Sequence, residues 1–300
     1  VDINPEEDVV HVQLIATELD EGLRAPFQYA YNDLNPGPII RAKVGDEIVV
    51  ELENRLSMPT TIHWHGVKVP WEMDGITWMM DPIMPDESFE YRFRANQSGT
   101  FWYHPHFNTE NQVDGGLYGV LILEDPDDPV PDTELVLLFD SGNEFEHDSG
   151  TMDPEEEPTE DDGHDHSHDH GHGQLVTEWL VNGESQPTYT VQGGDTVRVR
   201  AVNVSNFGYL SLTWPDMRQI ASDQGLLPQM IEPESVLLTP GDRAEFEWLI
   251  GETGFTVMAR PYSLNGGATG ADDVPLFEVL VTPPAPAPGG LNWPFPGGEP

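Results

Sequence analysis

Short runs of β-branched and aromatic residues recur along the chain, and many of them alternate between apolar and polar positions. The segments FEYRFR at 89–94 and VRVR at 197–200 are two clear examples. Alternation with a period of two is typical of strands, because successive side chains point to opposite faces of a sheet. The pattern predicts strands over residues 9–19, 47–53, 89–94, 117–123, 134–139, 196–202, 245–249 and 275–281.

Turn-forming residues separate these runs, and no amphipathic helix longer than two turns is evident. The chain contains 29 glycines and 28 prolines among its 300 residues. Many short strands separated by turns favour an all-β protein built of sandwiches.

An internal repeat divides the chain into two copies of one β-domain. Residues 45–50 (GDEIVV) match residues 194–199 (GDTVRV), and Asn54 then aligns with Asn203. Further along, residues 85–99 match residues 240–254. We expect one domain over residues 1–127 and a second over residues 128–282.

Two segments lie outside this repeat. Residues 141–174 are acidic and rich in histidine, and we interpret them as a loop inserted into the second domain. Residues 283–300 are rich in proline and glycine, which is typical of a linker or tail.

The first domain contains two histidine pairs, His63-Trp64-His65 and His104-Pro105-His106. In a strand, residues i and i+2 project from the same face, so each pair offers two adjacent imidazoles. Two such pairs on neighbouring strands would offer four. Imidazole is the usual nitrogen ligand of copper and zinc, so the pairs predict a metal site.

The second copy of the domain provides an internal control for this prediction. The four positions aligned with the paired histidines carry no histidine, and they are Leu212, Trp214, Ala259 and Pro261. A scaffold that needed the histidines for packing would retain some of them. Trp64 and Trp102, beside the pairs, are expected to face the opposite side of their strands and to pack in the core.

The inserted segment carries a further set of histidines that alternate with acidic or small residues: His164, His166, His168, His170 and His172. One interpretation is an accessory copper-collecting loop. The other is a charged loop that binds metals only weakly. Four methionines near Trp71 and Trp78 leave a similar choice, between a site for cuprous copper and adaptable packing: Met73, Met79, Met80 and Met84.

Charge and cysteine content exclude several classes of function. The chain has 54 acidic and 12 basic residues, for a formal net charge of -42, which argues against nucleic acid and anionic membrane surfaces as partners. It has no cysteine, which excludes disulfides, zinc–thiolate sites and thiolate nucleophiles. No apolar run approaches the length of a membrane-spanning helix.

Several ordered motifs of the first domain resemble those of the multicopper oxidases, which include laccases, bilirubin oxidases and bacterial cuprous oxidases. The motifs are TIHWHG at 61–66, MDG at 73–75, GTFWYHPH at 99–106 and GGLYG at 115–119. The second domain resembles the copper-free middle domain of three-domain members, through VNG at 181–183 and PGDR at 240–243. The resemblance implies two tandem cupredoxin-like Greek-key β-sandwiches.

The resemblance also implies roles for individual residues. His63 would be a ligand of the type 2 copper, and His65, His104 and His106 would be ligands of the coupled type 3 pair. Asp74 would be a carboxylate that relays protons toward bound oxygen, although an aspartate before a glycine is equally typical of a turn.

The chain departs from the family pattern in one large respect. A complete enzyme has a third domain with further histidines and a type 1 site that requires a cysteine thiolate, and this chain has no cysteine. We therefore expect an oxidoreductase chain that supplies half of a trinuclear oxygen-reducing copper centre and is inactive alone. A third domain or a cysteine-bearing cupredoxin partner chain would complete it.

The expected partners are copper ions, oxygen and a one-electron donor such as a phenol or a cuprous ion. The expected location is periplasmic or extracellular, with the signal peptide not in this sequence. The main alternative is a copper-sequestering or copper-delivering protein without turnover of its own. A third alternative is a structural relative that has kept the scaffold and lost turnover.

Overall fold

The computed structural model describes residues 8–20, 27–141, 178–223, 225–263, 267–268 and 272–283. The strands of the first half are β1 (Val9–Glu18), β2 (Tyr29–Tyr31), β3 (Ile40–Lys43), β4 (Glu47–Asn54), β5 (His63–His65), β6 (Ser88–Arg94), β7 (Gly99–His104) and β8 (Gly119–Glu124). A 3-10 helix, η1 (Trp71–Met73), and one short α-helix, α1 (Thr109–Asp114), lie between them.

The second half of the described chain consists of strands. They are β9 (Thr133–Ser141), β10 (Trp179–Val181), β11 (Glu184–Ser185), β12 (Thr188–Gln192), β13 (Thr196–Asn203), β14 (Leu210–Thr213), β15 (Gln219–Ser222), β16 (Gly225–Ile231), β17 (Val236–Leu238), β18 (Arg243–Leu249), β19 (Phe255–Ser263), β20 (Gly267–Ala268) and β21 (Val274–Thr282).

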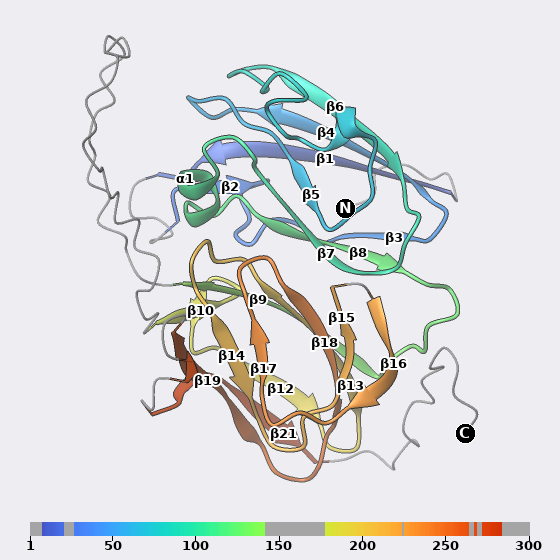
Figure 1. Cartoon of the computed structure of the whole chain (residues 1–300), viewed down its shortest axis with the longest axis vertical. Coiled ribbons are helices and arrows are strands. Elements are labelled where there is room, and N and C mark those ends of the chain that lie inside the picture. Colours follow the sequence, from blue (N-terminus) through green and yellow to red (C-terminus); the bar gives the residue numbers. More distant parts are fainter. Residues whose placement is uncertain are drawn as a thin grey trace.

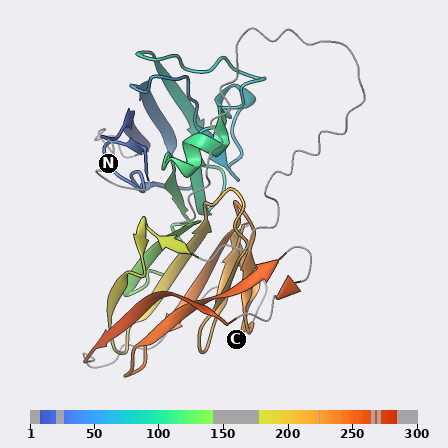
Figure 2. The same cartoon turned by 90° about the vertical axis from the view of Figure 1, so that its left-hand side faces the viewer.

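These strands form two β-sandwiches, one stacked on the other (Figure 1). The first sandwich combines the sheets β2-β1-β4-β6 and β3-β8-β7-β5. The second combines β11-β10-β9-β13-β18-β15-β16 with β12-β21-β19-β14-β17. The view from the side shows the same arrangement, with the first sandwich above the second (Figure 2). The predicted all-β fold of tandem sandwiches is confirmed.

All eight predicted strand ranges are found as strands, and no end differs from the prediction by more than two residues. The strands that the sequence did not predict are short or lack a clear alternation. β5, which carries the first histidine pair, is only 3 residues long. A run of three residues is too short for a period of two to be recognised.

The structure also confirms the internal repeat. In each sandwich a central strand pairs in parallel with one neighbour and antiparallel with the other: β4 with β1 and β6, and β13 with β9 and β18. His63 pairs with His104 in the first sandwich, and Leu212 pairs with Ala259 in the second. These are the positions that the sequence alignment equates.

Asn54 and its counterpart in the second sandwich, Asn203, stabilise equivalent turns. The Asn54 side chain is buried and donates to the carbonyls of Met58 and Ile83 at 2.9 and 2.8 Å. Its Oδ1 accepts a hydrogen bond from the backbone N–H of Leu56 at 3.0 Å. One side chain therefore binds three backbone groups of the loop, and the Ile83 carbonyl accepts a second hydrogen bond from the Thr60 N–H.

Replacing Asn54 with alanine should lower the free energy of unfolding by about 2–3 kcal/mol, because each of the three hydrogen bonds contributes ~1 kcal/mol. Denaturant-induced unfolding, followed by tryptophan fluorescence, measures the change. Asn96, which is exposed, provides the matched Asn→Ala control and should cost ~0.5 kcal/mol or less. Equal losses for the two variants would contradict the role of Asn54.

The two sandwiches share an apolar layer of their own. β8 is buried on both faces: Leu121 and Leu123 point into the first core, whereas Val120 and Ile122 point toward the second sandwich. The layer contains buried residues from both halves of the chain, namely Phe27, Trp102, Val113, Tyr118, Val120, Ile122, Leu138, Leu180, Val202 and Val204. Burial on both faces explains why β8 reads as a continuous apolar run instead of an alternating one.

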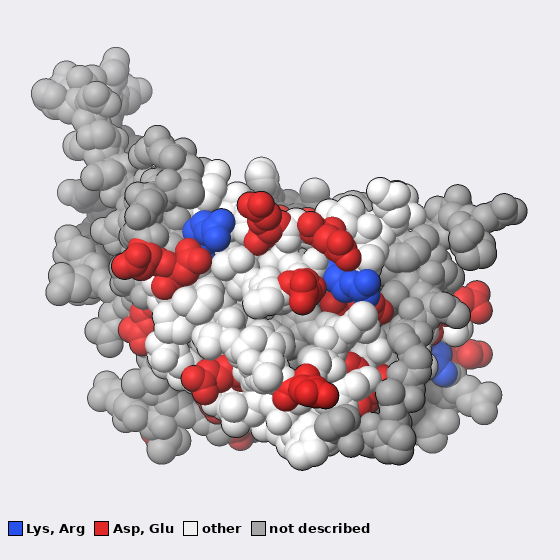
Figure 3. Space-filling model, turned by 90° about the horizontal axis from the view of Figure 1, so that it is seen from below, with Lys and Arg blue, Asp and Glu red and all other residues white. Residues whose placement is uncertain are grey.

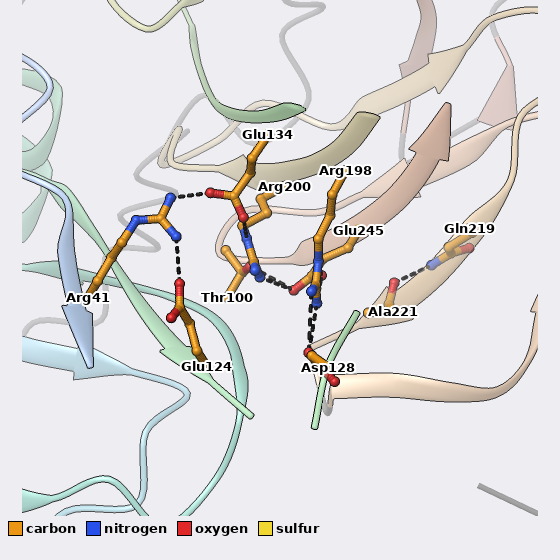
Figure 4. A network of polar contacts seen from close by, with 10 residues as sticks. All are labelled: Arg41, Thr100, Glu124, Asp128, Glu134, Arg198, Arg200, Gln219, Ala221 and Glu245. Carbon is orange, nitrogen blue, oxygen red and sulfur yellow. Dashed lines mark hydrogen bonds and ion pairs between the residues drawn. The ribbon is translucent and has the colours of Figure 1, made fainter. Parts of the chain in front are cut away.

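A network of buried ion pairs lies beside this layer (Figure 4). Glu245 of β18 accepts hydrogen bonds from Arg198 Nε at 2.7 Å and from Arg200 Nη1 at 2.8 Å. Thr100 of the first sandwich donates to the same carboxylate at 2.7 Å. Glu134 extends the network from Arg200 to Arg41 of β3. Apolar and ionic contacts therefore both join the sandwiches.

The predicted acidic insertion joins β9 to β10, two paired strands in which Ser141 lies opposite Trp179. The predicted histidine tract at 164–172 and the predicted tail at 283–300 lie outside the described residues, except for residue 283. The boundary near residue 128 falls in the connection between β8 and β9, and remains a prediction.

The described surface shows the strong acidic bias of the sequence. Acidic side chains are scattered over the lower face of the second sandwich, with few basic ones among them (Figure 3). Among the helices in the described part of the chain, none is long and apolar enough to cross a membrane.

Candidate metal centre

The two histidine pairs lie on neighbouring antiparallel strands. β5 pairs with β7 so that His63 is directly opposite His104, and His65 is opposite Trp102. Side chains that are opposite each other in a ladder share a face of the sheet, so His63, His65 and His104 project to the same side. His106 follows β7, and its backbone N–H donates a hydrogen bond to the Thr61 hydroxyl oxygen at 2.9 Å.

The histidine side chains converge closely enough to hold metal ions. Ring nitrogens of His63, His65 and His104 lie within 4.8 Å of one another. His65 Nδ1 lies 3.4 Å from His104 Nε2. The His106 ring centroid lies 5.3 Å from that of His63, so the fourth histidine borders the same cluster. The structure thus brings together all four predicted ligands.

Backbone carbonyls fix the orientation of two of these rings. His63 Nδ1 lies 2.9 Å from the Asp74 carbonyl oxygen, and His104 Nδ1 lies 2.9 Å from the Pro105 carbonyl oxygen. When Nδ1–H donates to a carbonyl, Nε2 carries the lone pair. Such contacts to the second ring nitrogen are typical of histidines that bind metals.

Asp74 lies beside the cluster and also in a turn. Its Oδ1 lies 3.2 Å from His63 Nδ1, and its side chain is 24% exposed. Gly75 follows with a positive φ of +73°, and a Cβ there would meet the Ile62 carbonyl oxygen at 1.9 Å. Asp74 is therefore both a turn residue and a neighbour of His63, which is compatible with both interpretations of the sequence.

Burial favours the neutral form of three of the imidazoles, those of His63, His65 and His104. It lowers the pKa of His65 to about 3, with further contributions from the charges of Arg243 and His63. Burial also lowers the pKa of His104 well below its ordinary value, and it lowers the pKa of His63 although Asp74 opposes the change. Neutral imidazole is the form that binds metals.

Both parts of the prediction are confirmed for Trp64, whereas Trp102 is buried in an apolar cluster as predicted but does not face away from the histidines. Trp64 is fully buried in the first core, against Tyr91 and Phe93. Trp102 instead stacks on His104 and on His65, at centroid distances of 4.0 and 4.9 Å. The reason is the strand period: Trp102 and His104 are two residues apart on β7 and so share a face.

The four methionines near Trp71 and Trp78 differ in burial. Met73 and Met80 pack against the first core, whereas Met79 and Met84 are exposed. The contacts of Met73 and Met80 with the core are compatible with adaptable packing.

The second sandwich also contributes to the site, which the sequence did not indicate. Gly241 lies against the ring of His65, and a Cβ at this position would be 2.7 Å from its Cε1 atom. Arg243 lies against Gly66, the residue after His65. Both belong to the segment PGDR, which the sequence showed only as a similarity of the second domain.

The donor set suits copper. Imidazole nitrogens form the cluster, two rings have their orientation fixed by carbonyls, and no cysteine occurs anywhere in the sequence. Neutral imidazole nitrogens suit copper and zinc, and the similarity of these motifs to copper oxidases favours copper.

Comparison with known proteins gives a consistent result. A family model described as multicopper oxidase matches residues 13–128. Multicopper oxidase MmcO of Mycobacterium tuberculosis is 44% identical over 111 residues, which cover 37% of this chain and 22% of the relative. Multicopper oxidase mco of Staphylococcus haemolyticus is 31% identical over 227 residues, covering 72% of this chain and 47% of the relative.

A solved structure extends the similarity to nearly the whole chain. The crystal structure of a multi-copper oxidase from Pseudomonas thermotolerans matches with a TM-score of 0.76 and 27% identity, and covers 96% of this chain and 67% of that chain. This chain spans about a fifth to a half of the length of the two relatives named above. The fold, the histidine cluster and these similarities agree: residues 13–128 match the multicopper oxidase model, and the chain as a whole is similar in fold to a solved multi-copper oxidase.

Proposed function

We propose that this chain binds copper through His63, His65, His104 and His106 and supplies half of the oxygen-reducing centre of a laccase-like oxidase. One observation carries the proposal: three ring nitrogens converge within 4.8 Å on the edge of a sheet. The same edge carries the fourth histidine, and carbonyls hold two of the rings in a ligand orientation.

The roles of the residues follow from their contacts. Copper bound here would supply one-electron redox chemistry toward oxygen. His63 and His104 present Nε2 because their Nδ1 atoms face carbonyls, and His65 presents Nδ1 to the cluster. Asp74 is the candidate proton carrier: its carboxylate adjoins His63 and is partly exposed, so it can take a proton from water.

The remaining parts of an oxidase would come from elsewhere. The chain has no cysteine and so cannot form a type 1 site. We propose that a third domain or a cysteine-bearing cupredoxin chain supplies that site and the other histidines, and that the assembly acts in the periplasm or outside the cell. Its reducing substrate would be a one-electron donor such as a phenol or a cuprous ion.

Copper titration of the purified chain tests the proposal. The wild type should bind copper, and a double variant with His63→Gln and His104→Gln should bind at least about 100-fold more weakly, which corresponds to about 2.7 kcal/mol. His11, which pairs with Glu51 on the surface of β1 and β4, provides the matched His→Gln control and should retain wild-type affinity. A wild-type chain that binds no copper would contradict the proposal.

A copper-sequestering or copper-delivering role is the second candidate, and the lack of any cysteine in the sequence favours it. Oxygen uptake separates the two candidates. An oxidase half should support oxygen consumption with an electron donor once a cysteine-bearing cupredoxin chain is added. A sequestering protein should bind copper tightly and consume no oxygen under the same conditions.

A further inference from the structure

The turn that leads into β18 of the second sandwich rests against the ring of His65 in the first. A Cβ placed on Gly241 would lie 2.7 Å from His65 Cε1 and 3.0 Å from Nε2. No side chain larger than hydrogen fits here unless the imidazole moves, because distances under 3 Å lie well inside van der Waals contact. The backbone of Gly241 therefore forms a wall for this ring.

The backbone conformation alone does not require glycine at this turn. Gly241 has a φ of +86°, and the aligned residue of the first sandwich, Asp86, has a φ of +65°. Aspartate and asparagine tolerate this left-handed region, so the repeat itself shows that the turn accepts a side chain. What distinguishes the second copy is that its turn contacts His65.

Arg243 fixes this turn against the first sandwich. It is only 5% exposed, and it donates from Nε to the Thr100 carbonyl at 3.1 Å and from Nη1 to the Gly241 carbonyl at 3.2 Å. Asp223 neutralises its charge at 2.7 Å. A Cβ on Gly66 would be 2.4 Å from Arg243 Nη2, so the guanidinium also lies tightly against the residue that follows His65.

Other residues contact the remaining sides of the His65 ring. Trp102 stacks on it with an interplanar angle of 30° and a centroid distance of 4.9 Å. The Nδ1 edge faces His104 Nε2 at 3.4 Å. The Nε2 edge is the one that faces Gly241. The ring thus cannot turn Nε2 toward the other histidines without moving away from this turn.

We propose that Gly241, held in place by Arg243, is a positioning residue that makes His65 present Nδ1 to the metal. The second sandwich carries none of the paired histidines, yet it would determine the geometry of one ligand in the first. This inference rests on the proposed function only in that it takes His65 to be a ligand. The packing contact itself does not depend on copper.

A pair of matched variants tests the proposal. Gly241→Asn keeps a residue that tolerates positive φ and adds a side chain against His65. Gly45→Asn makes the same change at another positive-φ glycine, where an added Cβ meets nothing within 4 Å. Gly241→Asn should weaken copper binding by roughly tenfold or more, as changes behind a metal-binding histidine usually do. Gly45→Asn should leave the affinity unchanged.

Nuclear magnetic resonance of the metal-free protein gives a second readout. The ring nitrogen and carbon-bound proton signals of His65 should shift in Gly241→Asn, and those of His11 should not. If Gly241→Asn fails to fold, Gly241→Ala repeats the test with the smallest possible intrusion. Unchanged copper affinity in the folded variant would overturn the proposal. If the wild type binds no copper, the proposed function fails, and the His65 signals alone decide whether Gly241 sets the ring orientation.

Discussion

Replacing Glu245 with glutamine should lower the free energy of unfolding by about 3–5 kcal/mol, the usual cost of removing one partner from a buried ion pair. Glu245 is 2% exposed and lies between Arg198 and Arg200, each of which is 4% exposed. Without the carboxylate, two guanidinium groups would remain buried with less compensation. The loss of stability should be large because both arginines would still be removed from water on folding, without the carboxylate that compensates for this cost.

The pH dependence of this contribution follows from the pKa of Glu245. Burial alone would raise it, but Arg200 and Arg198 hold it below its ordinary value of 4.5. A carboxyl with a depressed pKa in the folded state stabilises the protein above its ordinary pKa, and this contribution is lost as the pH falls through the folded-state value. The difference between wild type and Glu245→Gln should therefore be full at pH 7 and shrink below about pH 4.5.

Equilibrium unfolding in urea at pH 7 and at pH 4 measures both effects. The matched control is Glu90→Gln, because Glu90 pairs with Arg92 at the surface, where the two side chains are 47% and 46% exposed. Exposed pairs contribute between 0 and about 1 kcal/mol, so the control should change little. A Glu245→Gln variant as stable as the control would show that the network does not hold the sandwiches together.

The sequence predicted those features that depend on local spacing. A period of two located eight strands, and glycine and proline located the breaks between them. The His-X-His spacing placed His63 and His65 on one face, and the structure shows the second pair beginning on the neighbouring strand. The two copies of the repeat have the same strand register. Leu212 and Ala259 could therefore be aligned with His63 and His104 without a structure.

Features that depend on how the two sandwiches meet were not predictable. The alternation at 197–200 identifies a strand, but it does not show that Arg198 and Arg200 are buried against the first sandwich. A polar face that pairs with another domain has the same pattern as one in water. The contact between Gly241 and His65 joins residues from different copies of the repeat, and no spacing along the chain encodes it.

Replacing Asp140 with asparagine should make the protein less sensitive to alkaline pH. Asp140 is 3% exposed at the junction of the sandwiches and accepts hydrogen bonds from Tyr118 Oη at 3.0 Å and from the Ser141 N–H at 2.8 Å. Burial, together with the charge of Asp114, raises its pKa from 3.8 to about 8 although these hydrogen bonds oppose the change. The folded protein therefore retains a proton at neutral pH that the unfolded chain releases.

The sign of the effect follows from this difference in bound protons. A carboxyl with a raised pKa contributes full stability below its unfolded-state pKa, and stability is lost as the pH rises toward the folded-state value. The loss cannot exceed about 1.4 kcal/mol per pH unit, and over the interval from 3.8 to about 8 it should amount to several kcal/mol.

Unfolding curves recorded from pH 4.5 to pH 8.5 should show wild type and Asp140→Asn diverging as the pH rises, with the variant more stable by about 2–5 kcal/mol at the alkaline end relative to the acidic end. Asp127→Asn removes one negative charge from an exposed position, and so controls for the general self-repulsion of a chain with a net charge of -42. Its curve should run parallel to that of the wild type. If the Asp140→Asn curve did so as well, Asp140 would be ionised in the folded state at neutral pH. The junction between the sandwiches would then have to stabilise a buried carboxylate through Tyr118 and Ser141 alone.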